Sequence, residues 1–308
     1  MNEMGKKCTL CPRNCAVDRE NGQTGICGQT EELKVARAAL HYWEEPCISG
    51  EKGSGAVFFS GCALHCVYCQ NQSIANGTAG KNISIERLAE IFLELQEKGA
   101  NNINLVTPGH FAPQIVRALT IAKNQGMHLP VVYNTSSYEH VDTIRMLEGS
   151  VDIYLPDFKY MDPSMAAKYS HAPDYPEVAK AAIAEMVRQT GAATFDGEGE
   201  NALMKSGTIV RHLMLPGGME DSMRIIRYLY ETYKDTIYIS IMNQYTPLPH
   251  VKKYPELDRK ITEEEYDKLV DFAIETGVEN GFIQEGETAE ESFIPAFDGE
   301  GVEHGEVE

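Results

Sequence analysis

The stretch 55-GAVFFSGCALHCVYCQN-71 joins a short apolar run to three closely spaced cysteines. Residues 55–60 have the composition of a buried β-strand, and the cysteine loop begins at Gly61. Comparable apolar runs recur along the chain, at residues 102–107, 130–134, 151–156, 208–213 and 236–242. The stretch therefore predicts the first strand of a repeating unit, with chemically reactive side chains directly after it.

Helical patterns separate these apolar runs. Residues 84–99 carry an apolar stripe, with Ser84 as the candidate N-cap and Gly99 as the stop signal. Further helices are predicted at residues 113–126, 139–149, 176–191, 220–234 and 262–277. Strands that alternate with helices predict an α/β fold with a parallel sheet. Right-handed crossovers then place the carboxyl ends of all strands on one side, which carries the chemistry in barrels of this type.

One segment interrupts the alternation. Residues 192–207 are rich in Gly and Asp, which predicts a hairpin inserted before the fifth strand.

The composition bounds the partners of the protein. The 308 residues include 27 Lys plus Arg and 46 Asp plus Glu, so the formal net charge is 27 − 46 = −19. A surface this negative repels phosphate backbones, and we expect no nucleic-acid binding. No apolar run approaches the roughly 18 residues of a membrane span. The start, MNEMGKK, lacks the apolar core of a secretory signal, so we expect a cytoplasmic protein without membrane attachment.

The three cysteines of the opening stretch, Cys62, Cys66 and Cys69, have the spacing C-x3-C-x2-C. Three thiolates so close together can surround one compact metal centre. A zinc site normally needs a fourth Cys or His, and His65 is adjacent to Cys66, which directs it away. A [4Fe–4S] cluster held by three cysteines leaves one iron open to a ligand. A zinc or electron-transfer site with a distant fourth ligand is the alternative.

This spacing, on the first strand of a six-unit βα fold, resembles the radical SAM superfamily. The resemblance implies a partial (β/α)6 barrel of the radical SAM type, in which the open iron binds S-adenosylmethionine. One electron from the cluster then breaks the sulfonium S–C5′ bond, and the 5′-deoxyadenosyl radical abstracts hydrogen from a substrate.

Further stretches narrow the resemblance. Tyr68 before the third cysteine and Asn71 shortly after it are similar to the branch of the pyruvate-formate-lyase-activating enzyme, and most of all to its uncharacterised iron–sulfur relatives. The stretches that carry this likeness are residues 44–62, 103–115, 151–160, 209–217 and 239–247.

The resemblance also implies which residues contact S-adenosylmethionine. The second strand of activating enzymes ends in a Gly-Gly-Glu stretch that receives the methionine amino group. Here the stretch is Thr107-Pro108-Gly109-His110, so backbone carbonyls, Thr107 or His110 must take that role. We expect Arg211 to pair with the ligand's carboxylate or with Asp157, because an unpaired buried arginine is costly. The remaining candidate contacts on the ends of later strands are Asn134, Ser136, Asp157, Lys159 and Gln244.

All eight cysteines lie in the first quarter of the chain, which favours metal ligands over disulfides in a reducing compartment. Four of them, Cys8, Cys11, Cys15 and Cys27, have the spacing C-x2-C-x3-C-x11-C and predict a zinc site or a second iron–sulfur cluster. A complete set of four cysteines leaves no open coordination position, so we assign it no catalysis. Cys47 is predicted to be a small buried apolar residue.

We expect three regions along the chain. Residues 1–50 form the cysteine-rich N-terminal segment, 51–250 the radical SAM partial barrel, and 251–308 a C-terminal helix with an acidic tail. Residues 282–297 are expected to act as a lid over the barrel, with Phe293 and Phe297 packing inward. The alternative is that they seal the barrel bottom.

The predicted function is that of a radical SAM oxidoreductase that activates a glycyl radical enzyme or modifies a protein. A small-molecule or peptide substrate is the first alternative. A non-catalytic iron–sulfur or zinc protein that binds a partner is the alternative of another class. The resemblance implies an electron donor such as flavodoxin or ferredoxin.

Overall fold

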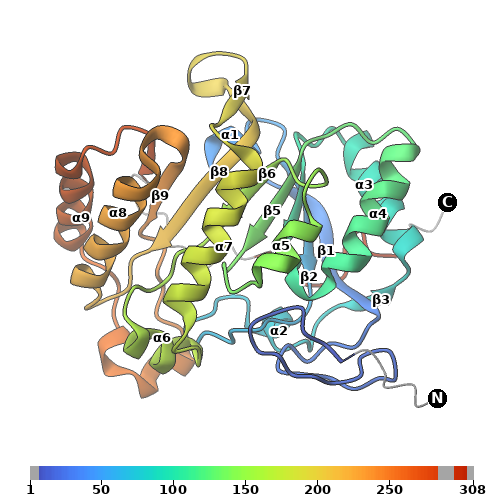
Figure 1. Ribbon diagram of the computed structural model, residues 1–308, viewed down its shortest axis with the longest axis horizontal. Coiled ribbons are helices and arrows are strands. Elements are labelled where there is room, and N and C mark those ends of the chain that lie inside the picture. Colours follow the sequence, from blue (N-terminus) through green and yellow to red (C-terminus); the bar gives the residue numbers. More distant parts are fainter. Residues whose placement is uncertain (1–6, 284–294, 304–308) are drawn as a thin grey trace.

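The computed structural model describes residues 7–283 and 295–303, which fold around one mixed β-sheet covered on one face by helices (Figure 1). The six predicted strands are confirmed, and they pair in parallel in chain order. They are β2 (Ser54–Phe59), β4 (Ile103–Val106), β5 (Val131–Thr135), β6 (Ile153–Pro156), β8 (Leu203–Leu213) and β9 (Tyr238–Met242). The α/β fold expected from the sequence is confirmed.

Short strands extend the sheet at both ends. β1 (Leu33–His41) pairs antiparallel with β2, and β3 (Lys81–Ile83) pairs antiparallel with β1. At the opposite end β10 (Gly281–Ile283) adds in parallel to β9. The sheet thus runs in the order β10-β9-β8-β6-β5-β4-β2-β1-β3, so the barrel is partial and not closed. β7 (Thr194–Asp196) pairs antiparallel with the start of β8, which confirms the predicted hairpin.

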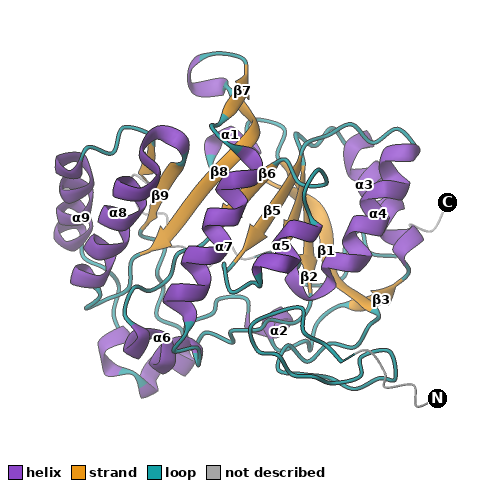
Figure 2. Ribbon diagram, viewed as in Figure 1, coloured by secondary structure: helices purple, strands orange, loops and turns teal. Residues whose placement is uncertain are grey.

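Six helices lie over one face of the sheet (Figure 2). Ser84 caps the first of them by accepting a hydrogen bond from the Arg87 amide, as the sequence predicts. Thr262 and Glu265 form a capping box at the start of the last. These helices confirm the predicted ones and are α3 (Ile85–Glu97), α4 (Ala112–Asn124), α5 (Val141–Met146), α7 (Tyr175–Thr190), α8 (Met219–Tyr233) and α9 (Glu263–Thr276).

The other face of the sheet, here called the inner face, is closed at the amino ends of the strands by α1 (Pro46–Ser49). Cys47 and Ile48 of this helix pack with apolar side chains of β5, β6 and β8. The side-chain amide of Asn102, just before β4, donates to the Ile48 carbonyl at 2.8 Å and fixes the helix there. Cys47 is therefore the small buried apolar residue that the sequence predicts.

At the carboxyl ends of the strands lie α2 (Gln72–Ala75), α6 (Pro163–Ser170) and the cysteine-rich N-terminal segment (Figure 1). The loop that carries Cys62, Cys66 and Cys69 follows β2 directly and reaches this same side. The sequence prediction that reactive groups lie at this end of the sheet is confirmed for the three cysteines.

Residues 295–303 run along the part of β1 that β3 leaves uncovered. The Gly299 amide donates to the Ala36 carbonyl at 3.1 Å, and the Ala38 amide donates to the Glu300 carbonyl at 2.8 Å. The Phe297 ring lies 5.5 Å from that of Phe58, on the inner face. Phe297 thus packs inward as expected, whereas Phe293 lies outside the described residues.

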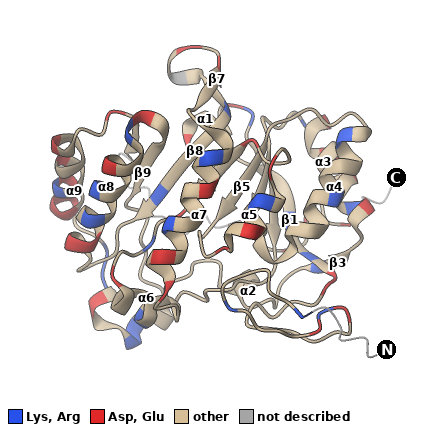
Figure 3. Cartoon of the chain, viewed as in Figure 1, with Lys and Arg blue, Asp and Glu red and all other residues tan. Residues whose placement is uncertain are grey.

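Charged residues of both signs lie mainly on the helices and loops, while the central strands carry few of them (Figure 3). Within the described residues, no helix combines the length and apolar character that crossing a membrane requires.

Candidate active site

The cysteine loop brings three thiols together at the carboxyl end of β2. The Cys69 amide donates to the Cys66 carbonyl at 3.0 Å, which closes a turn between these two residues. The Leu64 amide donates to the Cys62 Sγ at 3.4 Å. Burial raises the pKa of Cys69 to about 12, and the nearby Cys66 and Cys62 add to this rise. Thiols buried in this way become thiolates only when a metal centre or another cation compensates their charge.

A row of hydroxyl groups holds the cysteine loop. The Ser170 Oγ, at the end of α6, donates to the Cys66 Sγ at 2.9 Å. The same Oγ lies 2.7 Å from the Tyr160 hydroxyl, which donates to the Tyr68 hydroxyl at 2.7 Å. Sequence reasoning missed Ser170 and Tyr160, since both are far along the chain from the loop and no local pattern marks them.

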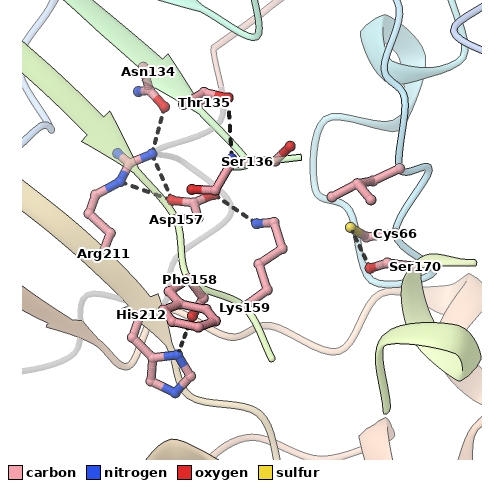
Figure 4. Close-up of polar contacts among 12 residues, drawn as sticks. Cys66, Asn134, Thr135, Ser136, Asp157, Phe158, Lys159, Ser170, Arg211 and His212 are labelled. Carbon is pink, nitrogen blue, oxygen red and sulfur yellow. Dashed lines mark hydrogen bonds and ion pairs between the residues drawn. The ribbon is translucent and has the colours of Figure 1, made fainter. Parts of the chain in front are cut away.

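Asp157, Lys159 and Arg211 form one half-buried group beside the loop, as the sequence predicts (Figure 4). The Lys159 Nζ lies 2.7 Å from one Asp157 carboxylate oxygen, and Arg211 lies 3.0 Å from the other. Burial alone would raise the pKa of Asp157, but the two cations together hold it below its ordinary value. Burial opposes the charge of Lys159, yet Asp157 and Cys66 raise the pKa of its ammonium group. The group is ionised and lies within electrostatic range of Cys66.

The other residues that were expected to contact S-adenosylmethionine differ in how directly they contact this group. The Asn134 Oδ1 accepts from Arg211 at 2.6 Å, and the Asn134 carbonyl accepts the Thr107 amide at 2.9 Å. The Ser136 carbonyl accepts the Tyr175 hydroxyl at 2.9 Å. The Gln244 carbonyl accepts the Gln70 side-chain amide, from the end of the cysteine loop, at 3.1 Å. Their contacts with S-adenosylmethionine remain predictions.

Glu44 is a member of this half-buried group that sequence reasoning missed. Its carboxylate lies 2.9 Å from Arg211 and accepts the side-chain amides of Asn104 at 3.1 Å and Asn134 at 3.2 Å. Glu44 opens the stretch 44–62 that carries the family resemblance, and this was the one signal that pointed to it. Its position depends on α1, which holds the preceding residues Glu44 and Glu45 against the inner face of the sheet. No local sequence pattern reveals this placement.

His110 lies apart from the Asp157 group. Its Nε2 is 2.6 Å from the Ser60 carbonyl, and burial lowers its pKa to about 4. It lines a small pocket together with all four N-terminal cysteines, Cys8, Cys11, Cys15 and Cys27. A contact between His110 and S-adenosylmethionine therefore gains no support from its position.

The N-terminal segment grips the cysteine loop. The Arg13 guanidinium donates to the Ala63 carbonyl at 2.8 Å and to the carbonyls of Ser170 and His171. The His65 Nε2 lies 2.8 Å from the Ile26 carbonyl, so this histidine turns away from the cysteines, as its neighbour position predicts.

The distances between possible ligand side chains bear on which kind of metal centre the protein can hold. In the described parts of the chain, no three His, Cys, Asp or Glu side chains stand as close as one bound metal ion requires. A [4Fe–4S] cluster attaches each cysteine to a different iron, so its ligands need not converge on one point. Three thiols in one loop suit the chemistry of such a cluster. Cluster binding by Cys62, Cys66 and Cys69 and metal binding by the N-terminal cysteines both stay predictions.

The sequence comparisons agree with this geometry. Residues 56–196, which include the cysteine loop, Asp157 and Lys159 but neither Glu44 nor Arg211, match the family model of the radical SAM superfamily. This part of the chain is a radical SAM domain. The match implies an enzyme that performs radical chemistry.

One relative extends the match beyond the radical SAM domain, and a second matches a shorter stretch. An uncharacterised protein of Methanocaldococcus jannaschii is 27% identical over 276 residues, which cover 87% of this chain and 74% of the relative. The pyruvate formate-lyase-activating enzyme of Clostridium pasteurianum is 28% identical over 112 residues, or 34% of this chain and 45% of the enzyme. The chain thus matches less than half of the activating enzyme's length.

A solved structure shares the fold of the radical SAM domain. Streptococcus suis SuiB, determined with bound S-adenosylmethionine, has a TM-score of 0.50 and 11% identity. The likeness covers 77% of this chain and 52% of SuiB.

Proposed function

We propose that the protein is a radical SAM enzyme that holds a [4Fe–4S] cluster on Cys62, Cys66 and Cys69. The observation that carries this proposal is the half-buried loop at the carboxyl end of β2, where three thiols lie near one another beside an ionised Asp157, Lys159 and Arg211 group. When bound, the cluster would supply the electron that cleaves S-adenosylmethionine into a 5′-deoxyadenosyl radical, which abstracts hydrogen from the substrate.

The chain's own residues position the reactants. Lys159 and Arg211 are two cations that both pair with Asp157. The carboxylate of bound S-adenosylmethionine would pair with one of them and replace part of its contact with Asp157. Buried apolar and aromatic side chains around the loop, Leu64 and Tyr68 among them, exclude water from the radical chemistry.

The test is anaerobic turnover of S-adenosylmethionine by the reconstituted, reduced protein. We expect 5′-deoxyadenosine to form, and we expect each of Cys62→Ala, Cys66→Ala and Cys69→Ala to abolish it. Cys47→Ala serves as the matched control, because Cys47 is buried under the sheet and away from the loop. Absence of turnover in the wild-type protein with a full cluster would favour the non-catalytic alternative.

For the substrate we propose a protein, as in glycyl-radical-enzyme activation. The partial identity to the Clostridium pasteurianum activating enzyme supports this class. Deuterium transfer from a labelled substrate into 5′-deoxyadenosine identifies the hydrogen donor. Transfer from a small molecule or a peptide, and none from proteins, would replace this proposal by its alternative.

We propose an external flavodoxin or ferredoxin as the electron donor. A surface pocket of about 250 Å³ reaches Cys66 and Cys69 and is also lined by His65, His250 and Lys253. Lys253 brings a positive charge to this pocket on a chain of net charge −19, and it suits the acidic surface of such a donor.

For the N-terminal cysteines we propose a structural zinc ion or a second cluster. These cysteines lie close together. Besides burial, Cys15 and Cys27 raise the pKa of the Cys11 thiol, and Cys8 and Cys15 raise that of the Cys27 thiol. All eight cysteines are free thiols, which suits a reducing cytoplasmic compartment. Metal analysis of the purified protein, compared with that of Cys8→Ser, tests the site.

A further inference from the structure

A buried arginine lies beside the four N-terminal cysteines. Arg19 is 4% exposed and lines the same small pocket as Cys8, Cys11, Cys15 and Cys27. Burial raises the pKa of the Cys27 thiol, and the positive charge of Arg19 lowers it, so these two groups lie within electrostatic range of each other. One cation and four possible thiolates therefore share one pocket.

The hydrogen bonds of Arg19 go to carbonyl groups. Its Nη1 donates to the His110 carbonyl at 2.6 Å, and its Nε and Nη2 donate to the Thr30 carbonyl at 3.1 and 2.5 Å. The guanidinium also lies over the Phe111 ring, 5.5 Å from the ring centroid. Within residues 7–283 and 295–303, no carboxylate forms an ion pair with Arg19. These contacts satisfy its N–H donors but do not neutralise its charge.

The charge of Arg19 specifies what the pocket is suited to hold. A buried charge without a counter-ion is costly, and breaking a buried pair strongly destabilises a fold. Neutral thiols do not supply the opposite charge. Four thiolates around one zinc ion carry two units of net negative charge, and four thiolates around an oxidised [4Fe–4S] cluster carry the same. Either centre would supply the counter-charge that Arg19 lacks.

The backbone around Cys15 points to the same occupant. The Ile26 amide donates to the Cys15 Sγ at 3.4 Å. A Cβ atom at Gly25 would lie 2.7 Å from that Sγ, so the glycine leaves the room that this close approach needs. A hydrogen bond donated to sulfur favours the thiolate over the thiol, because it stabilises the negative charge. A second observation, independent of Arg19, thus indicates a charged sulfur in this pocket.

We propose that Arg19 is the counter-ion of a negatively charged metal centre in which Cys8, Cys11, Cys15 and Cys27 all bind as thiolates. The inference rests on the metal site proposed above for these cysteines and does not depend on the radical chemistry. The four thiols release their protons to solvent when the metal binds. Arg19 then faces the negative charge that the metal leaves uncompensated.

The test is metal binding to the full chain with Cys62→Ala, Cys66→Ala and Cys69→Ala, so that the cysteine loop contributes no metal. Zinc alone, and iron with sulfide, are titrated under anaerobic conditions. We expect one of them to bind. Arg19→Gln is expected to weaken this binding at least about tenfold, and Arg19→Lys, which keeps the charge, to stay within about threefold of the parent. Arg117→Gln, an exposed arginine of α4, is the matched control and leaves binding unchanged.

Thermal unfolding separates a counter-ion from an arginine that only holds carbonyl groups. In the metal-free protein the charge of Arg19 is uncompensated, so Arg19→Gln is expected to leave the unfolding midpoint unchanged or to raise it. In the metal-loaded protein the same variant is expected to lower the midpoint.

Three results overturn the proposal: a midpoint lowered equally in both states, an unchanged metal affinity of Arg19→Gln, or a parent that binds neither metal. If Arg19→Gln does not fold, Arg19→Lys decides, because a loss of affinity beyond about tenfold shows that charge alone is not what the site needs. Formation of 5′-deoxyadenosine is not the readout, so failure of this proposal and failure of the proposed radical chemistry give separate results.

Discussion

At the scale of single residues, the environment of Cys66 connects structure to chemistry most directly. Its Sγ accepts a hydrogen bond from Ser170, whose hydroxyl is itself fixed by Tyr160. Hydrogen bonds to the sulfur ligands of an iron–sulfur cluster are among the factors that set its reduction potential. They stabilise the reduced form, because that form places more negative charge on sulfur.

We therefore predict that Ser170→Ala lowers the midpoint potential of the cluster by tens of millivolts, on the order of one hydrogen bond. Redox titration followed by electron paramagnetic resonance measures the shift. Ser164→Ala is the control, since this serine lies at the other end of α6. An unchanged potential in Ser170→Ala would show that this contact is structural.

The buried carboxyl group of Glu139 makes us expect that the free energy of unfolding depends on pH. Its buried carboxyl group accepts hydrogen bonds from the Thr135 hydroxyl at 2.7 Å and the Tyr133 hydroxyl at 3.3 Å. Burial raises its pKa from 4.5 to about 7. The folded protein keeps this proton to higher pH than the unfolded chain does. The free energy of unfolding therefore falls as pH rises from about 4.5 to about 7, by on the order of 3 kcal/mol, and is flat above that range.

We predict that Glu139→Gln removes this fall. Urea unfolding at about pH 5 and at about pH 8 gives the two free energies. Glu97→Gln, an exposed carboxylate at the end of α3, should keep the wild-type difference. The burial assigned to Glu139 is refuted if its variant retains the full difference.

At the scale of elements, the cysteine-rich segment acts as a clamp on the cysteine loop. Arg13 is the centre of the clamp, because it binds one carbonyl of the loop and two at the end of α6. Its guanidinium also lies over the Tyr138 ring, 5.1 Å from the ring centroid.

We predict that Arg13→Ala loosens the loop and accelerates loss of the cluster to air or chelators severalfold. The decay of visible absorbance during exposure to a chelator measures the rate. Arg117→Ala removes an exposed arginine of α4 and should decay at the wild-type rate. Equal rates for the two variants would contradict the clamp.

The elements also show what the sequence can and cannot predict. The six parallel strands, their helices and the cysteine loop were predictable, because hydrophobic periodicity and local spacing encode them. β1 and β3 were missed, because they pair antiparallel outside the repeat. Glu44 and Ser170 were missed for a related reason: each acquires its function from a partner distant in sequence, Arg211 and Cys66. His110 shows the opposite case. It lies near the end of a strand, as predicted, but its side chain lines the pocket of the N-terminal cysteines and not the Asp157 group.

At the scale of the whole molecule, residues 295–303 contact the sheet far from their neighbours in sequence. Arg37 of β1 pairs with Asp298 at 3.3 Å and also with Glu300. Arg87 of α3 donates to the Val302 carbonyl at 3.0 Å, and Val302 is fully buried in the core under α3. Residues 295–303 thus cover a strand edge that would otherwise be open to pairing with other chains.

We predict that truncation after residue 294 lowers the thermal unfolding midpoint by several degrees and promotes aggregation, because Val302 and the edge of β1 lose their cover. Calorimetry and light scattering measure the two effects. Truncation after residue 303 is the control and should leave both unchanged. Deletion of residues 282–308 additionally tests the lid: unchanged substrate binding and unchanged uncoupled cleavage would exclude it.

The clamp on the cysteine loop has a consequence for biogenesis. Arg13 binds carbonyls 50 and 158 residues further along the chain, at Ala63 and His171. Arg13 is thus synthesised well before its last partner, His171. Docking of the segment is consequently a late step of maturation. Until then residues 61–71 lack the contact with Arg13, and under the proposed function this is the interval in which a cluster can be inserted into the loop.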